Sequence, residues 1–86
     1  MKYPIAIEPG NHADAWGVIV PDLPGCFSAA DSGIDEAIDN AKQAIELWIE
    51  TALDDNQDVP RPSSINALQK KKEFKGMIWA LSLIHI

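Results

Sequence analysis

The chain has 86 residues, enough for one small domain and too few for an enzyme with a deep cleft between two lobes. With 47% hydrophobic and 23% charged residues, its composition is typical of a folded protein and excludes wholesale disorder. The net charge of −6 argues against direct binding to nucleic acid, because phosphate contacts need clustered Lys and Arg, and favours a basic protein partner.

The first two predicted elements form a hairpin. Residues 2–8 alternate between apolar and polar positions, which predicts a strand with one buried face. Because Pro4 cannot donate a ladder hydrogen bond, it favours an edge position or the first residues of a strand. Residues 9–14 have the composition of a turn, and they lead to a second predicted strand over residues 15–20.

The segment Pro21-Asp22-Leu23-Pro24-Gly25 then interrupts the apolar run. Two prolines without a ladder donor, an Asp between them and a glycine free to adopt positive φ predict a rigid turn between two strands. The third predicted strand, residues 26–30, consists mainly of small residues and leaves room for an element packed closely over it.

A long helix is predicted from Asp31-Ser32 to about Asp54. Ser32 is expected to cap the free N–H groups of its first turn, with Asp35 in the capping-box position. Apolar residues recur at steps of three and four, which predicts a stripe that covers the sheet. The stripe comprises Ile34, Ala37, Ile38, Ala41, Ile45, Trp48 and Ala52, and it is widened by Ala44, Ile49 and Leu53.

The other side of this helix carries an acidic ridge in which Lys42 is the only cation. The ridge comprises Asp35, Asp39, Glu46, Glu50 and Asp54. Its spacing fits two interpretations, a solvated helix face or a surface that meets a partner.

The remaining chain predicts a short helix and a last strand. Residues 60–62 force an extended segment, after which Ser63 or Ser64 can cap a helix from Ile65 to about Lys72. The basic run 70–75 is interpreted as solubilising, or as a contact to the acidic helix, rather than as a phosphate site. Residues 77–86 alternate as a strand that is apolar on both faces. Such a strand should be central or covered, so its position near the end of the chain predicts dimerisation or truncation.

Chemistry that would indicate an enzyme is weak in this sequence. His12 and His85 have no ligand at a metal-like spacing, and Cys26 has no histidine at a suggestive spacing, so we expect neither a metal, nor a cofactor, nor a nucleophile. A nuclease-like carboxylate cluster is the enzymatic alternative, and it would draw on Glu8, Asp14, Asp22 and Asp35. Without a signal peptide or an apolar run of the ~20 residues that span a membrane, the expected location is cytoplasmic.

Five pieces in this order resemble the HicB antitoxins over residues 2 to about 80. They are Tyr3-Pro4, residues 20–27, residues 34–37 leading into Asn40-Ala41, residues 59–63 and residues 76–80. The resemblance implies an α+β, partial RNase H-like β-β-β-α-β fold in a single domain of residues 1–86, which agrees with an antiparallel sheet covered on one face by the long helix. For this chain we expect that single domain without the C-terminal DNA-binding domain of many family members.

The resemblance also implies a function, namely binding and neutralising a basic HicA-type toxin that cleaves mRNA, with no reaction of its own. It further implies a homodimer or homotetramer, and no direct contact to nucleic acid or membrane. The predicted toxin-binding residues are Asp22, Leu23, Pro24, Phe27, Asp39, Glu46, Trp48 and Glu50. The turn that contains the first three either touches toxin or only shapes the sheet. A divergent metal-dependent nuclease and a stand-alone oligomerising or sensory domain are the alternatives.

Overall fold

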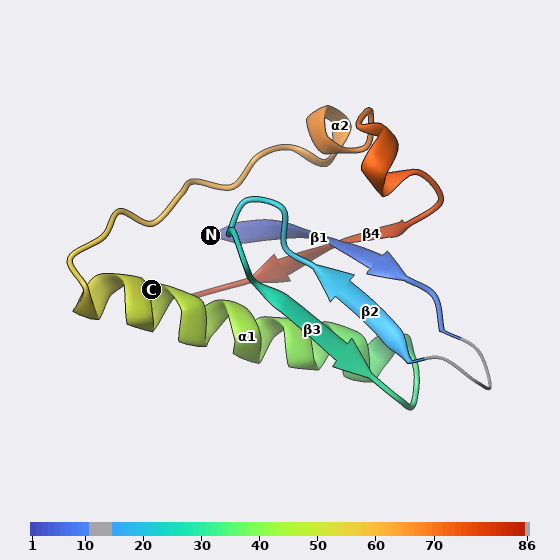
Figure 1. The fold of residues 1–86 in the computed structure, drawn as a ribbon, viewed down its shortest axis with the longest axis horizontal. Coiled ribbons are helices and arrows are strands. Elements are labelled where there is room, and N and C mark those ends of the chain that lie inside the picture. Colours follow the sequence, from blue (N-terminus) through green and yellow to red (C-terminus); the bar gives the residue numbers. More distant parts are fainter. Residues whose placement is uncertain (11–14, 86) are drawn as a thin grey trace.

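A computed structural model describes residues 1–10 and 15–85 (Figure 1). Its elements are β1 (Lys2–Glu8), β2 (Trp16–Ile19), β3 (Phe27–Ala30), α1 (Ile34–Asp54), α2 (Ile65–Leu68), the short 3-10 helix η1 (Lys72–Phe74) and β4 (Ile78–Leu83). The strands form one antiparallel sheet in the order β3-β2-β1-β4. Figure 1 shows α1 on one side of this sheet and α2 on the other. The predicted α+β fold is confirmed.

Both faces of β1 are buried, so the prediction of a single buried face was wrong. Tyr3 and Ile5 lie opposite Ser82 and Ala80 of β4 and belong to the core under α1. On the other face, Ala6 is fully buried beside Trp79, against whose ring Phe74 packs edge-on at 5.4 Å. The segment that contains α2 and η1 therefore closes the second face, which alternation within β1 could not reveal.

Pro4 lies in an inner strand rather than at an edge. The alternation of hydrogen-bonded and non-bonded pairs explains why a proline is tolerated there. Met1 and Ile84 exchange both backbone hydrogen bonds at 2.7 Å, so alternate pairs along β1 and β4 are bonded and Pro4–Leu81 is a non-bonded pair. The nitrogen of Pro4 points toward the β2 side, where pairing begins only at Ala6. The missing donor is thus not needed.

The core lies between the sheet and α1. Five residues of α1 are buried, namely Ala37, Ala41, Ile45, Ile49 and Ala52. Because three of them are alanines, the helix can approach the strands closely. Two predicted members of the stripe lie at its margins instead, since Ile34 is 36% and Leu53 is 54% exposed.

The N-terminus of α1 is organised differently from the predicted capping box. Gly33 occupies the N-cap with φ 134°, and no side chain caps the helix there. The Ser32 hydroxyl and the Asp31 N–H instead donate to the Glu36 carboxylate, so Glu36 has the role expected of Asp35. The bond from Ser32 lowers the pKa of Glu36. This contribution to stability is present above the ordinary pKa of the carboxyl and is lost as the pH falls through the lowered value.

The helix and the strand of the C-terminal third are both shorter than predicted. The Ser64 hydroxyl caps α2 by accepting from the Ala67 N–H at 3.2 Å, and the helix ends at Leu68, before η1 begins. The last strand, β4, is an edge strand and not a central one, because within residues 1–10 and 15–85 it pairs with β1 alone. Ile86 lies outside the described residues.

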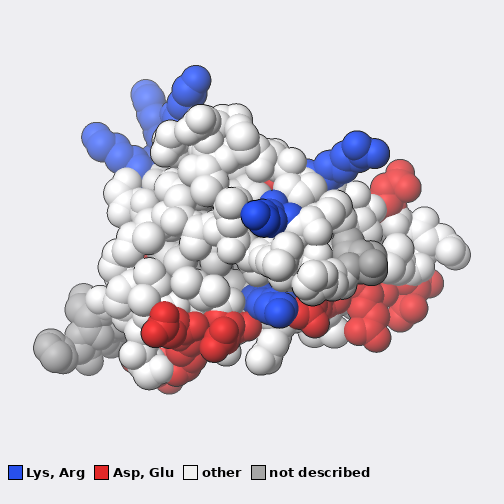
Figure 2. Space-filling view, turned by 180° about the vertical axis from the view of Figure 1, so that it is seen from behind, with Lys and Arg blue, Asp and Glu red and all other residues white. Residues whose placement is uncertain are grey.

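The charged groups are unevenly distributed over the surface. Figure 2 shows most acidic groups along the α1 side and one cluster of basic groups over the α2 end, with other basic groups elsewhere on this face. The lysines of residues 70–75 line a shallow hollow with Trp79, on the face away from α1. Their predicted contact with the acidic helix is therefore wrong for this chain. Among the described residues, no helix is long and apolar enough to cross a bilayer.

Candidate functional site

The site begins with the turn between β2 and β3. The Val20 N–H donates to the Cys26 carbonyl at 3.1 Å and the Cys26 N–H donates to the Leu23 carbonyl at 3.0 Å, while Gly25 supplies the positive φ of 79°. The Leu23 side chain is only 1% exposed and belongs to the core. The turn is thus fixed from within, and Leu23 offers almost no surface to a partner.

Asp22 is used to join this turn to the segment that follows α1. Its two carboxylate oxygens accept from the Ser63 N–H at 2.8 Å and from the Ser63 hydroxyl at 2.6 Å. The Tyr3 hydroxyl donates to the Pro60 carbonyl at 2.6 Å, which fixes the same segment. Burial, and secondarily the negative charge of Asp22, raises the pKa of Tyr3, so the phenol stays a neutral donor.

Replacing Asp22 by alanine is expected to destabilise the domain by about 1.5 kcal/mol, because both bonds to Ser63 are charge-assisted. The free energy of unfolding in urea, followed by circular dichroism, measures this loss. Asp58→Ala is the matched control, since this exposed carboxylate makes no side-chain hydrogen bond to another described residue. A loss for Asp22→Ala no larger than that of the control would show that the Ser63 contact contributes nothing.

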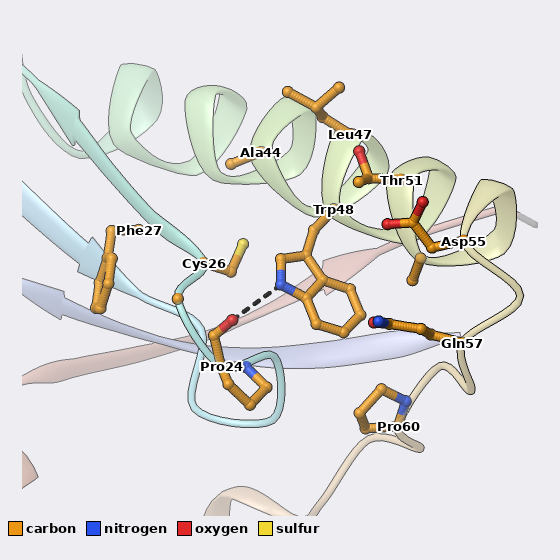
Figure 3. Close-up of a pocket in the computed structure, with 12 residues that line it drawn as sticks. Pro24, Cys26, Phe27, Ala44, Leu47, Trp48, Thr51, Asp55, Gln57 and Pro60 are labelled. Atoms are coloured by element: carbon orange, nitrogen blue, oxygen red, sulfur yellow. Dashed lines mark hydrogen bonds between the residues drawn. The ribbon is translucent and has the colours of Figure 1, made fainter.

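Beside the turn lies an apolar groove of about 740 Å³. Its walls come from the turn, the start of β3, α1 and the segment after α1. The lining residues are Pro24, Gly25, Cys26, Phe27, Ala44, Leu47, Trp48, Thr51, Ala52, Asp55, Gln57 and Pro60. Figure 3 shows the Trp48 indole reaching from α1 across to the turn, where its Nε1 donates to the Pro24 carbonyl at 2.9 Å.

Two large side chains stand exposed at this groove. Phe27, on β3, and Leu47, on α1, are each 65% exposed, and Trp48 lies half-buried between their elements. A single exposed apolar residue needs no explanation, but three large ones around one hollow mark a surface for a partner. Because the turn and α1 fix its walls, the groove is formed before anything binds.

The acidic residues of α1 mostly face away from the groove. Glu46 and Glu50 line a smaller hollow beside β4, together with Leu53, Ile84 and His85. An α-helix turns by about 100° per residue, so Glu46 and Leu47 lie on different flanks of α1. Asp55, just past the end of α1, is the carboxylate at the groove itself.

The structure therefore divides the sequence-predicted toxin-binding residues into three groups. Pro24, Phe27 and Trp48 meet in the groove. A second group is exposed on α1 outside the groove, namely Asp39, Glu46 and Glu50. The third group stabilises the turn: Asp22 bonds to Ser63, and Leu23 is buried in the core. Sequence reasoning missed Leu47 and Asp55. The sequence did contain a signal for Leu47, because this residue is apolar but lies on the polar side of the predicted helix.

The geometry shows little that could catalyse a reaction. Among residues 1–10 and 15–85, no three His, Cys, Asp or Glu side chains come together in a way that could hold a metal ion. His12 and Asp14 lie outside those residues. Cys26 is 4% exposed, and burial raises the pKa of its thiol, which lowers the fraction of reactive thiolate.

Comparison with known proteins identifies the family. A family model described as the HicB-like antitoxin of bacterial toxin–antitoxin systems matches residues 3–86. The chain is 45% identical over 78 residues to a 14.9 kDa protein from the rep–hol intergenic region of Haemophilus phage HP1. This match covers 91% of the chain but 56% of the phage protein, so the chain spans little more than half the length of that relative.

Solved structures agree with the family match. The N-terminal domain of Burkholderia pseudomallei antitoxin HicB is 36% identical and superposes with a TM-score of 0.85, covering all of both chains. A chain of the HicA3–HicB3 toxin–antitoxin complex is 25% identical and superposes with a TM-score of 0.82, again over all of both chains. The chain therefore belongs to the HicB-like antitoxin family of bacterial toxin–antitoxin systems.

Proposed function

We propose that this chain neutralises a HicA-type toxin by seating part of the toxin in the groove and covering its RNA-cleaving surface. The observation that carries the proposal is the pre-formed apolar groove with Phe27 and Leu47 exposed on it. It is supported by the similarity to a chain of the HicA3–HicB3 complex. In this proposal the chain itself catalyses no reaction and acts by occlusion.

The groove would supply most of the binding free energy. Large apolar and aromatic side chains that become fully desolvated in the middle of an interface dominate affinity. Phe27, Leu47 and Trp48 meet this description, and Pro24 shapes the wall against which Trp48 is held. Since the groove needs no rearrangement, little of the gain is lost to ordering the site.

The acidic residues of α1 would speed the encounter. A net charge of −6 attracts a basic partner, and Figure 2 shows the acidic groups gathered along the α1 side. We assign this steering to Asp39, Glu46 and Glu50, which are exposed and not engaged in the groove. Charges at the margin of an interface act mainly on the association rate.

Co-expression with a HicA-type toxin tests the function in cells. The wild-type chain is expected to restore growth to cells that produce the toxin. A variant with both Phe27→Ala and Leu47→Ala, produced at the same level, is expected not to restore it. Rescue by the variant equal to that of the wild type would place the toxin contact outside the groove.

Reversing two charges, Glu46→Lys with Glu50→Lys, is expected to slow association with the toxin by about 10-fold at low ionic strength and to leave dissociation nearly unchanged. Stopped-flow association measured at several salt concentrations checks this, and the salt dependence should also fall.

The control for this experiment is Glu8→Lys with Glu73→Lys, two exposed glutamates outside α1 that change the net charge by the same amount. If both double variants slow association equally, net charge alone accounts for the effect. The assignment of steering to α1 would then be wrong.

A further inference from the structure

The C-terminus of α1 is closed by a motif that fixes two side chains beside the groove. Asn56 adopts a positive φ of 55°, and its N–H donates to the Leu53 carbonyl at 3.1 Å. The Gln57 N–H donates to the Ala52 carbonyl at 2.8 Å. These two bonds form a Schellman motif, which satisfies carbonyls that the end of a helix would otherwise leave free. Asp55 and Gln57, on either side of Asn56, therefore have a defined backbone, and both line the groove.

An aromatic ring and several hydrogen-bond acceptors meet at this end of the groove. Trp48, Thr51 and Asp55 are three and four residues apart, so they lie on one face of the helix. Figure 3 shows the Asp55 carboxylate and the Gln57 amide near the six-membered ring of Trp48, whose Nε1 is directed the other way, to the Pro24 carbonyl. The groove thus combines a flat aromatic surface with a carboxylate at one end.

The Asp55 carboxylate lies where it lowers the stability of the free protein. It follows the C-terminus of α1, the negative end of the helix dipole, and the sequence of α1 ends in TALD, without a basic residue. Asp55 is exposed, and the neighbouring Asp54 adds a second negative charge. A cation supplied by a binding partner would therefore meet a carboxylate whose charge the helix itself does not offset.

We infer that this end of the groove binds an arginine side chain of the toxin, which rests on the function proposed above. A guanidinium is planar, so its face can stack on the Trp48 indole while its N–H groups fork to the Asp55 carboxylate. The Thr51 hydroxyl and the Gln57 side-chain oxygen supply acceptors for the remaining N–H groups. A lysine ammonium has neither the flat face nor the fork, so arginine matches this site better.

An arginine site would give the groove selectivity that its apolar part lacks. Figure 3 places Phe27 and Asp55 toward opposite ends of the groove, so the matching toxin segment carries apolar side chains followed by an arginine. Apolar contacts tolerate many sequences, whereas a carboxylate that is covered without receiving a cation or donor is strongly unfavourable. Asp55 is thus the specificity-determining residue of the groove.

Asp55→Asn tests this assignment, with Asp54→Asn as the matched control. Both remove one negative charge at the end of α1, but Asp54 does not line the groove. Asp55→Asn is expected to weaken binding to a HicA-type toxin by about 10-fold or more, mainly through faster dissociation, and Asp54→Asn by less than about threefold. Urea unfolding should show both variants to be at least as stable as the wild type, because each loses a charge that opposes the helix dipole. A purely structural role of Asp55 would not separate binding from stability in this way.

Arginine-to-lysine substitutions in the toxin, made one at a time, test the class of ligand. One of them is expected to weaken binding to the wild-type chain by about 10-fold while leaving binding to Asp55→Asn nearly unchanged, because substitutions of residues in contact are not additive. If no substitution shows this coupling, or if Asp55→Asn binds like the wild type, the arginine site is overturned.

The variant with both Phe27→Ala and Leu47→Ala distinguishes failure of the arginine site from failure of the groove. If this variant binds toxin weakly while Asp55→Asn binds normally, only the arginine assignment is wrong. If both bind like the wild type, the groove is not the toxin-binding surface, and the proposed function and the arginine site are both wrong.

Discussion

Toxin binding is expected to weaken by ~100-fold or more when Phe27 and Leu47 are both replaced by alanine. Each side chain is 65% exposed in the free protein and would become buried against the toxin. Central apolar anchors typically contribute about 2 kcal/mol each, or roughly 30-fold in affinity, and neighbouring contributions are not strictly additive. Titration calorimetry with a toxin whose catalytic residue has been replaced gives the dissociation constant.

The control for this variant is Leu53→Ala, which removes a leucine of similar exposure from the same helix outside the groove. It is expected to change the affinity by less than about threefold, as do most residues outside the centre of an interface. Thermal unfolding should be similar for all three proteins, because none of the changed side chains is buried. Equal affinities for the double variant and the control would show that the groove is not the binding surface.

The largest expected effect on stability comes from Ile45→Ala. This side chain is fully buried at the centre of the α1 stripe and packs in the core formed with the strands. Removing three of its carbons is expected to lower the free energy of unfolding by about 2–5 kcal/mol, because the protein loses apolar burial and is left with a cavity. The free energy of unfolding of a domain is roughly 5–15 kcal/mol in total, so the variant should be close to unfolding at moderate temperature.

Urea unfolding at 25 °C measures the loss, with Leu47→Ala as a comparison on the same helix. Replacing the exposed Leu47 is expected to lower the free energy of unfolding by less than about 0.5 kcal/mol, as is usual for surface substitutions. If Ile45→Ala lost less than about 1 kcal/mol, then the α1–sheet interface would not be the main core of the domain.

Local patterns in the sequence were sufficient for the element order and the fold class. The alternation over β1, the prolines of the turn and the helical spacing of Ile45 and its neighbours each encode one element directly. They do not encode which strands become neighbours. The edge position of β4 and the burial of both faces of β1 depend on strand order and on tertiary packing, which periodicity does not report.

The candidate site was predicted only in part, because the roles of several of its residues depend on tertiary contacts. The turn was recognised from its residue types, but the sequence could not show that Leu23 is turned into the core or that Asp22 is engaged by Ser63, 41 residues away. These roles depend on tertiary contacts. Leu47 was overlooked because it interrupts the helical pattern, and an apolar residue that serves a partner rather than the core is expected to do so.

Occlusion of a toxin requires a binding surface that is already in place. The turn, α1 and the segment around Pro60 are connected by Asp22, Trp48 and Tyr3, so the groove is held by hydrogen bonds from three separate parts of the chain. A surface organised in this way can bind without rearranging.

The most direct test is an RNA-cleavage assay in which a HicA-type toxin that the chain binds is titrated with the purified chain. We expect cleavage to fall linearly and to stop when one chain is present per toxin, the Phe27/Leu47 double alanine variant to leave cleavage active at the same ratio, and the chain alone to leave RNA intact. Cleavage that persists with excess wild-type chain, or cleavage of RNA by the chain alone, would contradict the proposed occlusion.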